Sequence, residues 1–154
     1  MFAGTFHHTL DAKNRLVIPS RLRAVLPADG PESKGFYVSL WQIKDTKCLS
    51  LFTRSAWEDH TARIEKLGEV DENAELYAAI MNADAEYVER DAEWRIVVPE
   101  SLISIVQLGS EVLLLGQRRQ ILVIDPQKWQ AIRGQHEPNY PEIYRKVQQI
   151  KRNG

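Results

Sequence analysis

Two stretches of the sequence repeat one charged pattern: Asp-Ala-x-x-Arg, three aliphatic residues, Pro, two residues and Leu. They read DAKNRLVIPSRL at residues 11–22 and DAEWRIVVPESL at residues 91–102. The guanidinium of an Arg can hold a phosphate, or the O6 and N7 atoms of a guanine, through two parallel hydrogen bonds. Arg15 and Arg95, which occupy the same position in the two copies, are therefore candidates for contact with a nucleic acid.

The first copy lies among other groups that suit the same partner. Lys13 offers a point charge for phosphate, and the amide of Asn14 can pair with adenine. A carboxylate cannot usefully face phosphate, so we expect Asp11 to accept hydrogen bonds from turn N–H groups or to pair with Arg15. Further basic or imidazole side chains close in sequence are His7, His8, Arg21 and Arg23.

Each of these groups also has a simpler interpretation. The Asp–Arg pair can be an internal salt bridge that shapes a β-turn, and this is favoured for the second copy, which lies among Glu86, Glu89, Arg90 and Glu93. His7 and His8 are neighbours on an expected strand, so their side chains alternate and at most one faces a given partner. The C-terminal cations most simply form a solvated face, with phosphate contact as the alternative; they are Arg145, Lys146, Lys151 and Arg152.

The charge distribution is more informative than the formal net charge of −1. Residues 1–25 contain four Lys or Arg residues and a single acid, whereas residues 58–100 contain thirteen acids and four basic residues. A neutral total therefore conceals a basic N-terminal segment beside an acidic middle. Solvated surfaces produce such asymmetry too, so the charge pattern alone does not decide the function.

The composition and the motif content argue against several other classes. There is no apolar run near the roughly 20 residues of a membrane span, and the start MFAGTFHHTL lacks the features of a signal peptide. The single Cys48, expected to be buried, cannot form an internal disulfide and fits a reducing cytosol. No hydrolase, nucleotide-binding or metal-ligand motif occurs. We therefore predict no catalytic residue, metal, cofactor, small-molecule substrate or membrane partner.

The elements that must position the repeated motif follow the same order in both halves of the chain. A strand leads into the Asp-Ala-x-x turn, a second strand ends at Pro, which lacks the ladder N–H, and a short helix follows. The expected strands around the turns are residues 4–10, 15–18, 86–90 and 95–98. Two further strands then follow in each half, namely FYVSLW and CLSLF, and EVLLLG and ILVID, the last pair joined by a QRRQ hairpin.

Helices are expected to close each half. Ser55 and Glu58 have the spacing of a capping box, and Asp125 precedes a Pro at the first helical position. Residues 71–82 and 140–151 have amphipathic periodicity. The expected apolar positions are Leu76, Ile80 and Met81 in the former, and Ile143, Val147 and Ile150 in the latter.

These patterns predict an α+β fold made by duplication, with halves at about residues 1–80 and 81–154. Strands this short cannot form an independent sheet in each half. We therefore expect the halves to intertwine into one small β-barrel with a pseudo-twofold axis and short flanking helices.

The combination resembles the MraZ family of bacterial transcriptional regulators. The carrying residues are Met-Phe-x-Gly at the start, then Leu-Asp-x-Lys-x-Arg with its Ile-Pro and following Arg, and the second Asp-x-x-x-Arg near residue 91. The resemblance implies a swapped-hairpin barrel like that of AbrB DNA-binding domains. It also implies a ring of subunits and sequence-specific binding to repeated promoter boxes of the cell-division and cell-wall gene cluster.

With this resemblance, we predict a DNA-binding regulator of the cytoplasm that associates with the nucleoid. Its partners are then double-stranded DNA with direct repeats and further copies of itself in a ring, because a single short basic turn is too little for tight binding. The alternative is a ring-forming or antitoxin-like interaction module without DNA specificity. The predicted DNA-binding residues are His7, Lys13, Asn14, Arg15, Arg21 and Arg95.

One position departs from the family pattern. The family usually has Gly just before each motif Arg, where this chain has Asn14 and Trp94. If this position needs a positive φ, Asn is among the more tolerant residues, whereas Trp is strained. We therefore expect the first turn to keep the family geometry and the second turn to adopt another one.

Overall fold

The computed structural model describes residues 1–154 and contains both strands and helices, as the sequence predicts. The strands are β1 (Phe2–Thr9), β2 (Arg15–Val17), β3 (Gly35–Ile43), β4 (Thr46–Phe52), β5 (Glu86–Glu89), β6 (Arg95–Val97), β7 (Glu111–Arg118) and β8 (Gln120–Ile124). The α-helices are α1 (Ser20–Arg23), α2 (Arg54–Gly68), α3 (Glu72–Asp84), α4 (Glu100–Val106), α5 (Pro126–His136) and α6 (Tyr140–Asn153). Short 3₁₀ helices are η1 (Pro31–Ser33) and η2 (Glu137–Asn139).

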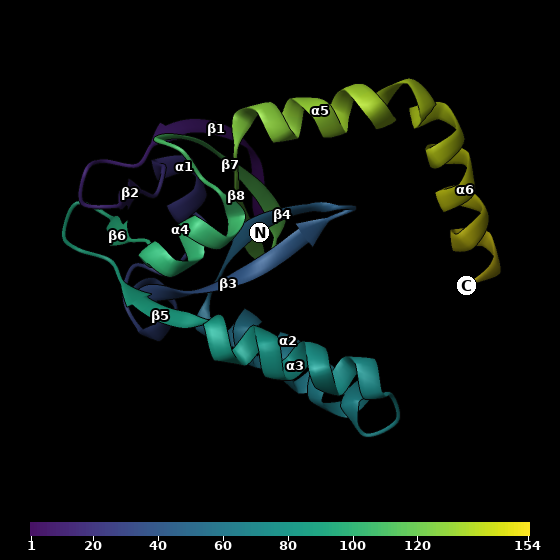
Figure 1. Ribbon diagram of the computed structural model, residues 1–154, viewed down its shortest axis with the longest axis horizontal. Coiled ribbons are helices and arrows are strands. Elements are labelled where there is room, and N and C mark those ends of the chain that lie inside the picture. Colours follow the sequence, from purple (N-terminus) through teal and green to yellow (C-terminus); the bar gives the residue numbers. More distant parts are fainter.

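The strands form two sheets that join the halves of the chain. Six of them make an antiparallel sheet in the order β1-β7-β8-β4-β3-β5, while β2 and β6 pair separately in a two-stranded sheet that we call the ribbon (Figure 1). β1 pairs with β7 from the second half, and β5 pairs with β3 from the first. When β1 to β4 are matched with β5 to β8, the strand order reads the same from either end, which is the expected pseudo-twofold relation.

The expected closed barrel is not found. β1 and β5 lie at the edges of the six-stranded sheet, and each has a strand partner on one side only. The ribbon strands pair with each other and not with these edges, so the sheet stays open.

The tight connections of the large sheet depend on residues with positive φ. The β3–β4 turn has Lys44 at φ 53°, and the β7–β8 turn has Arg118 at φ 60°, which is the backbone geometry that two-residue hairpins favour. The hairpin predicted for QRRQ is therefore confirmed.

The helix starts confirm one predicted cap and correct another. Asp125 caps α5, where its carboxylate accepts hydrogen bonds from the N–H groups of Gln127 and Lys128. The predicted Ser55 cap is wrong, because α2 begins one residue after Thr53, whose hydroxyl accepts from the Ala56 N–H. Ser55 instead donates its N–H and hydroxyl to the carboxylate of Glu32, so a contact from elsewhere in the chain overrode the local pattern.

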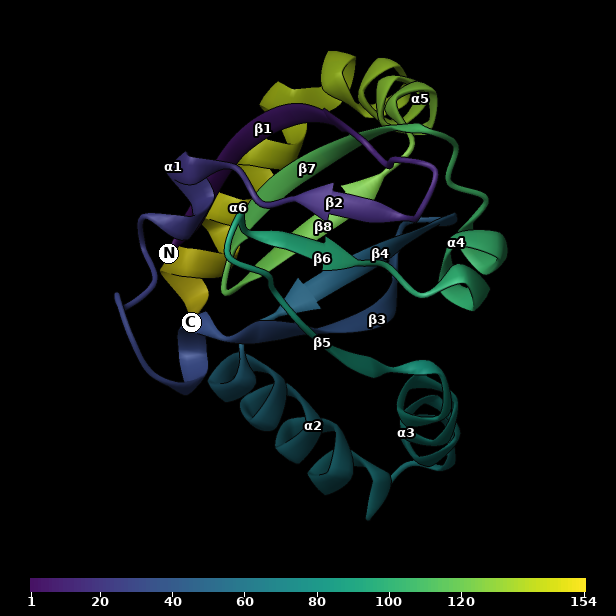
Figure 2. The ribbon, with the colours of Figure 1, turned by 90° about the vertical axis from the view of Figure 1, so that its left-hand side faces the viewer.

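The main core lies between one face of the large sheet and the inner face of the ribbon. Leu16 and Ile96, the central residues of the two ribbon strands, are fully buried there, and each burial is worth about 1.5–3 kcal/mol. α1 and α4 close the two ends of this layer with Leu22 and Leu102. The ribbon therefore packs over one side of the sheet, with one face buried and the other exposed to solvent (Figure 2).

The opposite face of the large sheet is covered by α5 and by the α2–α3 hairpin. Cys48 packs there among aliphatic residues beneath Trp129 of α5, and its predicted burial is confirmed. Burial raises the pKa of its thiol to about 12. Trp57 of α2 and Met81 of α3 pack with Phe52 at the other end of this face. None of the helices is both long and apolar enough to cross a membrane.

Two amphipathic predictions hold only in part, because the expected apolar faces are not covered. In α3, Met81 is buried, but Leu76 and Ile80 are exposed. α6 forms over nearly the predicted range, yet it has no buried residue at all.

Candidate nucleic-acid interface

The first turn holds Arg15 in a defined direction through a single carboxylate. Oδ1 of Asp11 accepts hydrogen bonds from the backbone N–H groups of Lys13 and Arg15, each at 2.9 Å. Oδ2 of the same carboxylate accepts from Nε of Arg15 at 2.6 Å. The two roles considered for Asp11, turn acceptor and ion-pair partner, are therefore both present. The remaining guanidinium nitrogens of Arg15 are left without an ion-pair partner in the chain.

The second turn repeats this arrangement. Oδ1 of Asp91 accepts from the N–H groups of Glu93 and Arg95, each at 2.9 Å, and Oδ2 accepts from Nε of Arg95 at 2.8 Å. The side chains of the two Arg residues are equally exposed, at 33%. In both copies the carboxylate thus orients the guanidinium in the same way.

Hydrogen bonding keeps both carboxylates charged. The backbone N–H of Arg15 is the largest cause that lowers the pKa of Asp11 below its usual 3.8, and the N–H of Arg95 does the same for Asp91. Because the folded-state pKa is depressed, the stabilisation of each turn is fully present above the unfolded pKa. It is lost only as the pH falls through the lowered value. The turns therefore keep their form throughout the neutral range.

The second turn does not adopt a different backbone geometry, and that expectation was wrong. Asn14 has φ 60° and Trp94 has φ 59°. The Trp94 indole packs against the edge of the main core, and the guanidinium carbons of Arg90 and Arg23 lie 4.2 and 5.6 Å from its ring centroid. A left-handed residue costs roughly 1–2 kcal/mol, and cation–π contacts of about 0.5–2 kcal/mol each offset this cost.

The ring contacts of Trp94, which Asn14 lacks, predict that substitution by Ala has different costs at these two equivalent positions. We expect Asn14→Ala to lower the free energy of unfolding by about 1 kcal/mol, because Ala is strained at positive φ. Trp94→Ala should cost about 2–3 kcal/mol, because the same strain remains while the ring contacts are lost. Urea unfolding followed by fluorescence or circular dichroism measures both values. Asn14→Gly serves as the unstrained control, and equal costs for the two Ala variants would show that the indole contributes nothing.

The ribbon places both Arg residues on its exposed face. Arg15 lies opposite Val97 and Val17 lies opposite Arg95, with the buried pair Leu16 and Ile96 between them. Because side chains alternate along a strand, these four residues share the outer face. Val17 and Val97 remain 39% and 55% exposed, which is unusual for aliphatic residues above a core. The outer face therefore alternates charged and apolar groups along a narrow two-stranded surface.

Since the ribbon strands are antiparallel, the two turns lie at opposite ends of the ribbon. α1 follows β2 and therefore lies beside the second turn, and α4 lies beside the first (Figure 2). The contact of Arg23 with Trp94 and the hydrogen bond from the Ile18 N–H to the Trp94 carbonyl show this directly. Arg21 and Arg23, which are close to the first turn in the sequence, thus lie on α1 next to the second turn.

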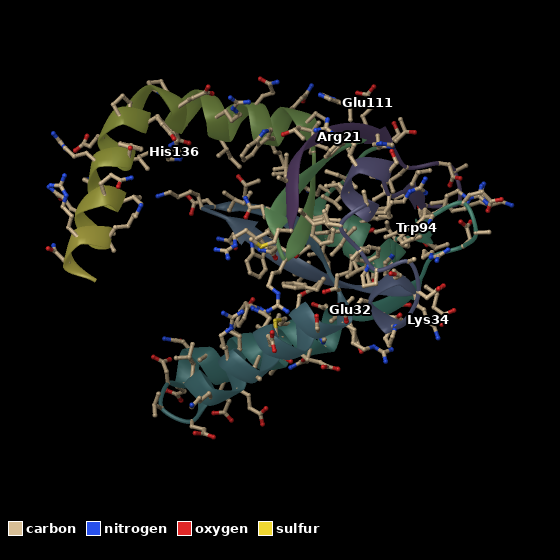
Figure 3. The ribbon with its side chains drawn as sticks, turned by 180° about the vertical axis from the view of Figure 1, so that it is seen from behind. Arg21, Glu32, Lys34, Trp94, Glu111 and His136 are labelled. Atoms are coloured by element: carbon tan, nitrogen blue, oxygen red, sulfur yellow. The ribbon has the colours of Figure 1, made fainter.

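Two other predicted DNA-binding residues, Arg21 on α1 and His7 on β1, lie outside the ribbon. The guanidinium of Arg21 lies over the Phe6 ring of β1 at 5.6 Å and away from Trp94 (Figure 3). His7 is paired with Leu113, whose side chain packs under α5, so His7 faces the side of the sheet opposite to the ribbon. The structure therefore brings Lys13, Arg15 and Arg95 to one layer but separates His7 from them.

The two ends of the ribbon differ in free positive charge. Lys13 has no ion-pair partner, whereas Glu93 at the equivalent position lies 3.6 Å from a terminal nitrogen of Arg95. Arg90, which precedes the second turn in the sequence, and Arg23, which the sequence placed with the first turn, add cations around Trp94. Pairing of β2 with β6 explains why Arg23 is there, because it places α1, which follows β2, beside the second turn, and α4, which follows β6, beside the first turn.

The two turns also lie within the segments that match a known family. The family model described as "MraZ protein, putative antitoxin-like" matches residues 1–77 and 81–147. The chain belongs to the MraZ family. The membership inferred from the repeated motif is thereby confirmed, and each of the two matched segments contains one Asp–Arg turn.

MraZ proteins of several bacteria are similar to this chain over most of its length. Transcriptional regulator MraZ of Roseiflexus sp. (strain RS-1) is 27% identical over 98% of this chain and 99% of its own. The protein of the same name from Acetivibrio thermocellus is 27% identical over 96% of both chains. That of Thermomicrobium roseum is 28% identical over 85% of this chain and 86% of its own. These MraZ relatives are named as regulators of transcription.

Proposed function

We propose that this protein is a sequence-specific DNA-binding regulator of transcription that reads DNA with the outer face of its ribbon. The observation that carries the proposal is the face formed by Arg15, Val17, Arg95 and Val97, in which a carboxylate orients each guanidinium. The names of the relatives support regulation of transcription as the biological role.

The dimensions and chemistry of this face suit the major groove of DNA. The groove admits a two-stranded β-ribbon, in which Arg pairs with guanine and an apolar group contacts the methyl of thymine. Exposed Val17 and Val97 supply the apolar groups beside the two Arg residues. Lys13 holds phosphate at the first end, and Asn14 forms the tight turn that lets it do so. Arg21 and Arg23 offer phosphate contacts near the second end.

Several copies must act together for useful affinity. One ribbon makes few contacts, each of which is weakened by salt, whereas linked copies bind successive sites with much higher avidity. We therefore propose that the chain assembles into a ring whose ribbons engage direct repeats in a promoter. The promoter of the cell-division and cell-wall gene cluster is the proposed target, and the nucleoid is the proposed location.

The proposal extends to the origin of the fold. The strand exchange supports two AbrB-like repeats, residues 1–80 and 81–154, that intertwine as swapped hairpins. In this arrangement neither repeat completes its own sheet. Each ribbon strand and each edge strand has its only strand partner in the other half of the chain.

Gel retardation at two salt concentrations tests the proposed function. The probes are DNA from upstream of the protein's own gene and a shuffled sequence of the same length and composition. We expect the upstream DNA to bind about 10³-fold more tightly or better, with affinity that falls as salt rises. Equal affinity for both probes would reduce the function to non-specific binding. An absence of binding to either probe would favour the alternative of a protein-interaction module.

A further inference from the structure

The second end of the ribbon carries two cations on one aromatic ring, and we call these three residues the Trp94 cluster: Arg23, Arg90 and Trp94. Arg23 ends α1, Arg90 directly follows β5, and Trp94 lies in the turn before β6. The guanidinium carbons of Arg90 and Arg23 lie 4.2 and 5.6 Å from the centroid of the indole. Figure 3 shows Trp94 on the ribbon side of the molecule, opposite to His136. The strand exchange therefore gathers positive charge from both halves of the chain at one end of the ribbon.

No acid of the chain neutralises the two cations of the cluster. Asp91 and Glu93, the acids of the turn, pair with Arg95 instead, and neither Arg23 nor Arg90 has an ion-pair partner. Both Arg residues are nevertheless half-buried. Partly desolvated cations without a counter-charge are costly, and two of them beside one ring repel each other. An anion that enters this site therefore removes an unfavourable charge from the free protein.

The chain fixes the two guanidinium groups but leaves donors free. Nε of Arg90 donates to the carbonyl of Ser33 at 2.9 Å and Nη1 donates to the carbonyl of Asp91 at 3.3 Å, so that Nη2 has no partner. The guanidinium of Arg23 is held by the indole alone and keeps its N–H groups free. Donors that are oriented in this way suit an anion with several oxygens, such as a phosphate.

The first end of the ribbon has no such cluster. The positions that match it in the first copy of the motif are Leu10, Asn14 and Ile103. Leu10 is buried in the main core and Ile103 packs against it. A turn of the same geometry therefore forms without cations at these positions, so the fold alone does not require them.

We propose that the Trp94 cluster is a phosphate site that anchors the DNA backbone at the second end of the ribbon. The inference rests on the proposed function, which places DNA on the outer face of the ribbon. It adds Arg90 as a phosphate-binding residue and Trp94 as the residue that positions both guanidinium groups. The anion is a phosphodiester of DNA because Arg95, the neighbour of Trp94, lies on that outer face. Phosphate contacts hold a protein on DNA without reading its sequence, so the cluster anchors while Arg15 and Arg95 read bases.

Salt titrations of DNA binding test the phosphate site. Each lost phosphate contact lowers the slope of log affinity against log salt by about 0.9. The variant is Arg23→Met with Arg90→Met, which removes both charges but keeps an unbranched side chain on the ring. Fluorescence anisotropy with the upstream and shuffled probes, from about 50 to about 200 mM chloride, gives the slopes. We expect the slope to fall by about 1.8 for each bound copy. Affinity for both probes should fall by one factor, so that the preference for the upstream DNA is retained.

Three further variants separate charge, position and location. Arg23→Lys with Arg90→Lys returns the charges and should restore the slope. Trp94→Asn gives the second turn the residue of the first, and it should lower the slope equally on both probes because the guanidinium groups lose their orientation. If the ring has only a structural role, Trp94→Asn lowers stability but leaves the slope unchanged, which contradicts the positioning role. Arg63→Met removes an exposed and unpaired Arg of α2 and should bind like the unaltered protein. Circular dichroism verifies that each variant is folded.

The proposal is overturned if the double Met variant keeps the unaltered slope, or if it loses affinity for the upstream DNA alone, because that loss is the mark of base reading. If the slopes agree and inorganic phosphate stabilises only the unaltered protein against urea, relative to chloride at equal ionic strength, the site binds a free anion and not DNA. Equal affinity of the unaltered protein for both probes contradicts the proposed sequence specificity, yet a lower slope of the Met variant then still supports the phosphate site. An absence of binding to either probe overturns both.

Discussion

Arg15→Ala is expected to abolish retardation of the upstream DNA while leaving the fold and the assembly intact. The two unpaired guanidinium nitrogens of Arg15 are the donors that can form a bidentate contact with a base. Loss of such a contact costs about 1–3 kcal/mol, which is roughly 5- to 150-fold in affinity for one copy. In the proposed ring, every copy loses the same contact. The Asp11 carboxylate also loses its cation, so its negative charge repels the phosphates of the DNA. Gel retardation at one fixed salt concentration measures the loss.

Two further Arg variants make this result specific. Arg133 pairs with Glu137 at the same i,i+4 spacing as the Asp–Arg pair of each turn, but it lies on α5, far from the ribbon, so Arg133→Ala should retain binding. Arg95→Ala should lose less than Arg15→Ala, because Glu93 already lies near the Arg95 guanidinium. Normal DNA binding by Arg15→Ala would show that the assigned face is wrong. An equal loss for both motif variants would contradict the asymmetry between the turns.

Gly116→Ala is expected to cost at least about 2–3 kcal/mol of the free energy of unfolding. A Cβ at this position would lie 2.6 Å from both Cα and the carbonyl carbon of Ala3, and also too close to its backbone nitrogen. These are backbone atoms of β1, so no side-chain rotation relieves the clash. β1 must then leave the sheet edge, and the first turn, which follows β1, loses its support. We therefore expect weaker DNA binding together with the loss of stability.

Gly134→Ala is the matched control for this substitution. Gly134 lies inside α5 with open space around its position, so Ala should stabilise the helix by roughly 0.5–1 kcal/mol. Thermal or urea unfolding measures both changes in the free energy of unfolding, which should fall for Gly116→Ala and rise for Gly134→Ala. A Gly116→Ala protein as stable as the unaltered one would mean that β1 and β7 do not approach as closely as described.

Local patterns predicted much of the fold and the chemistry of the turns. The order of strands and helices follows from residue spacing, Pro positions and turn residues, all of which act within a few residues along the chain. The role of Asp11 and Asp91 was predictable for the same reason, because a carboxylate four residues before an Arg can reach both the turn N–H groups and the guanidinium. The family motif added the expectation of DNA binding.

Errors arose where a distant segment decided the outcome. Ser55 was expected to cap α2, but Glu32 captures it and Thr53 takes its place. Trp94 was expected to force another turn, yet the core edge and the cations of Arg23, from the other half, and of Arg90 hold its ring at positive φ. The contacts of Glu32 with Ser55 and of Arg23 with Trp94 have no signal in the residues next to the affected position.

The sequence by itself determined that one motif occurs twice, with an oriented Arg in each copy, because these features depend on the residues between Asp11 and Leu22 and between Asp91 and Leu102. Only the tertiary structure decided that the two Arg residues share one exposed face, that His7 lies on the other side of the sheet and that α6 remains uncovered. The physical reason is that strand pairing across the two halves assigns each side chain to a face, and a short strand can meet several partners equally well until the whole sheet is assembled.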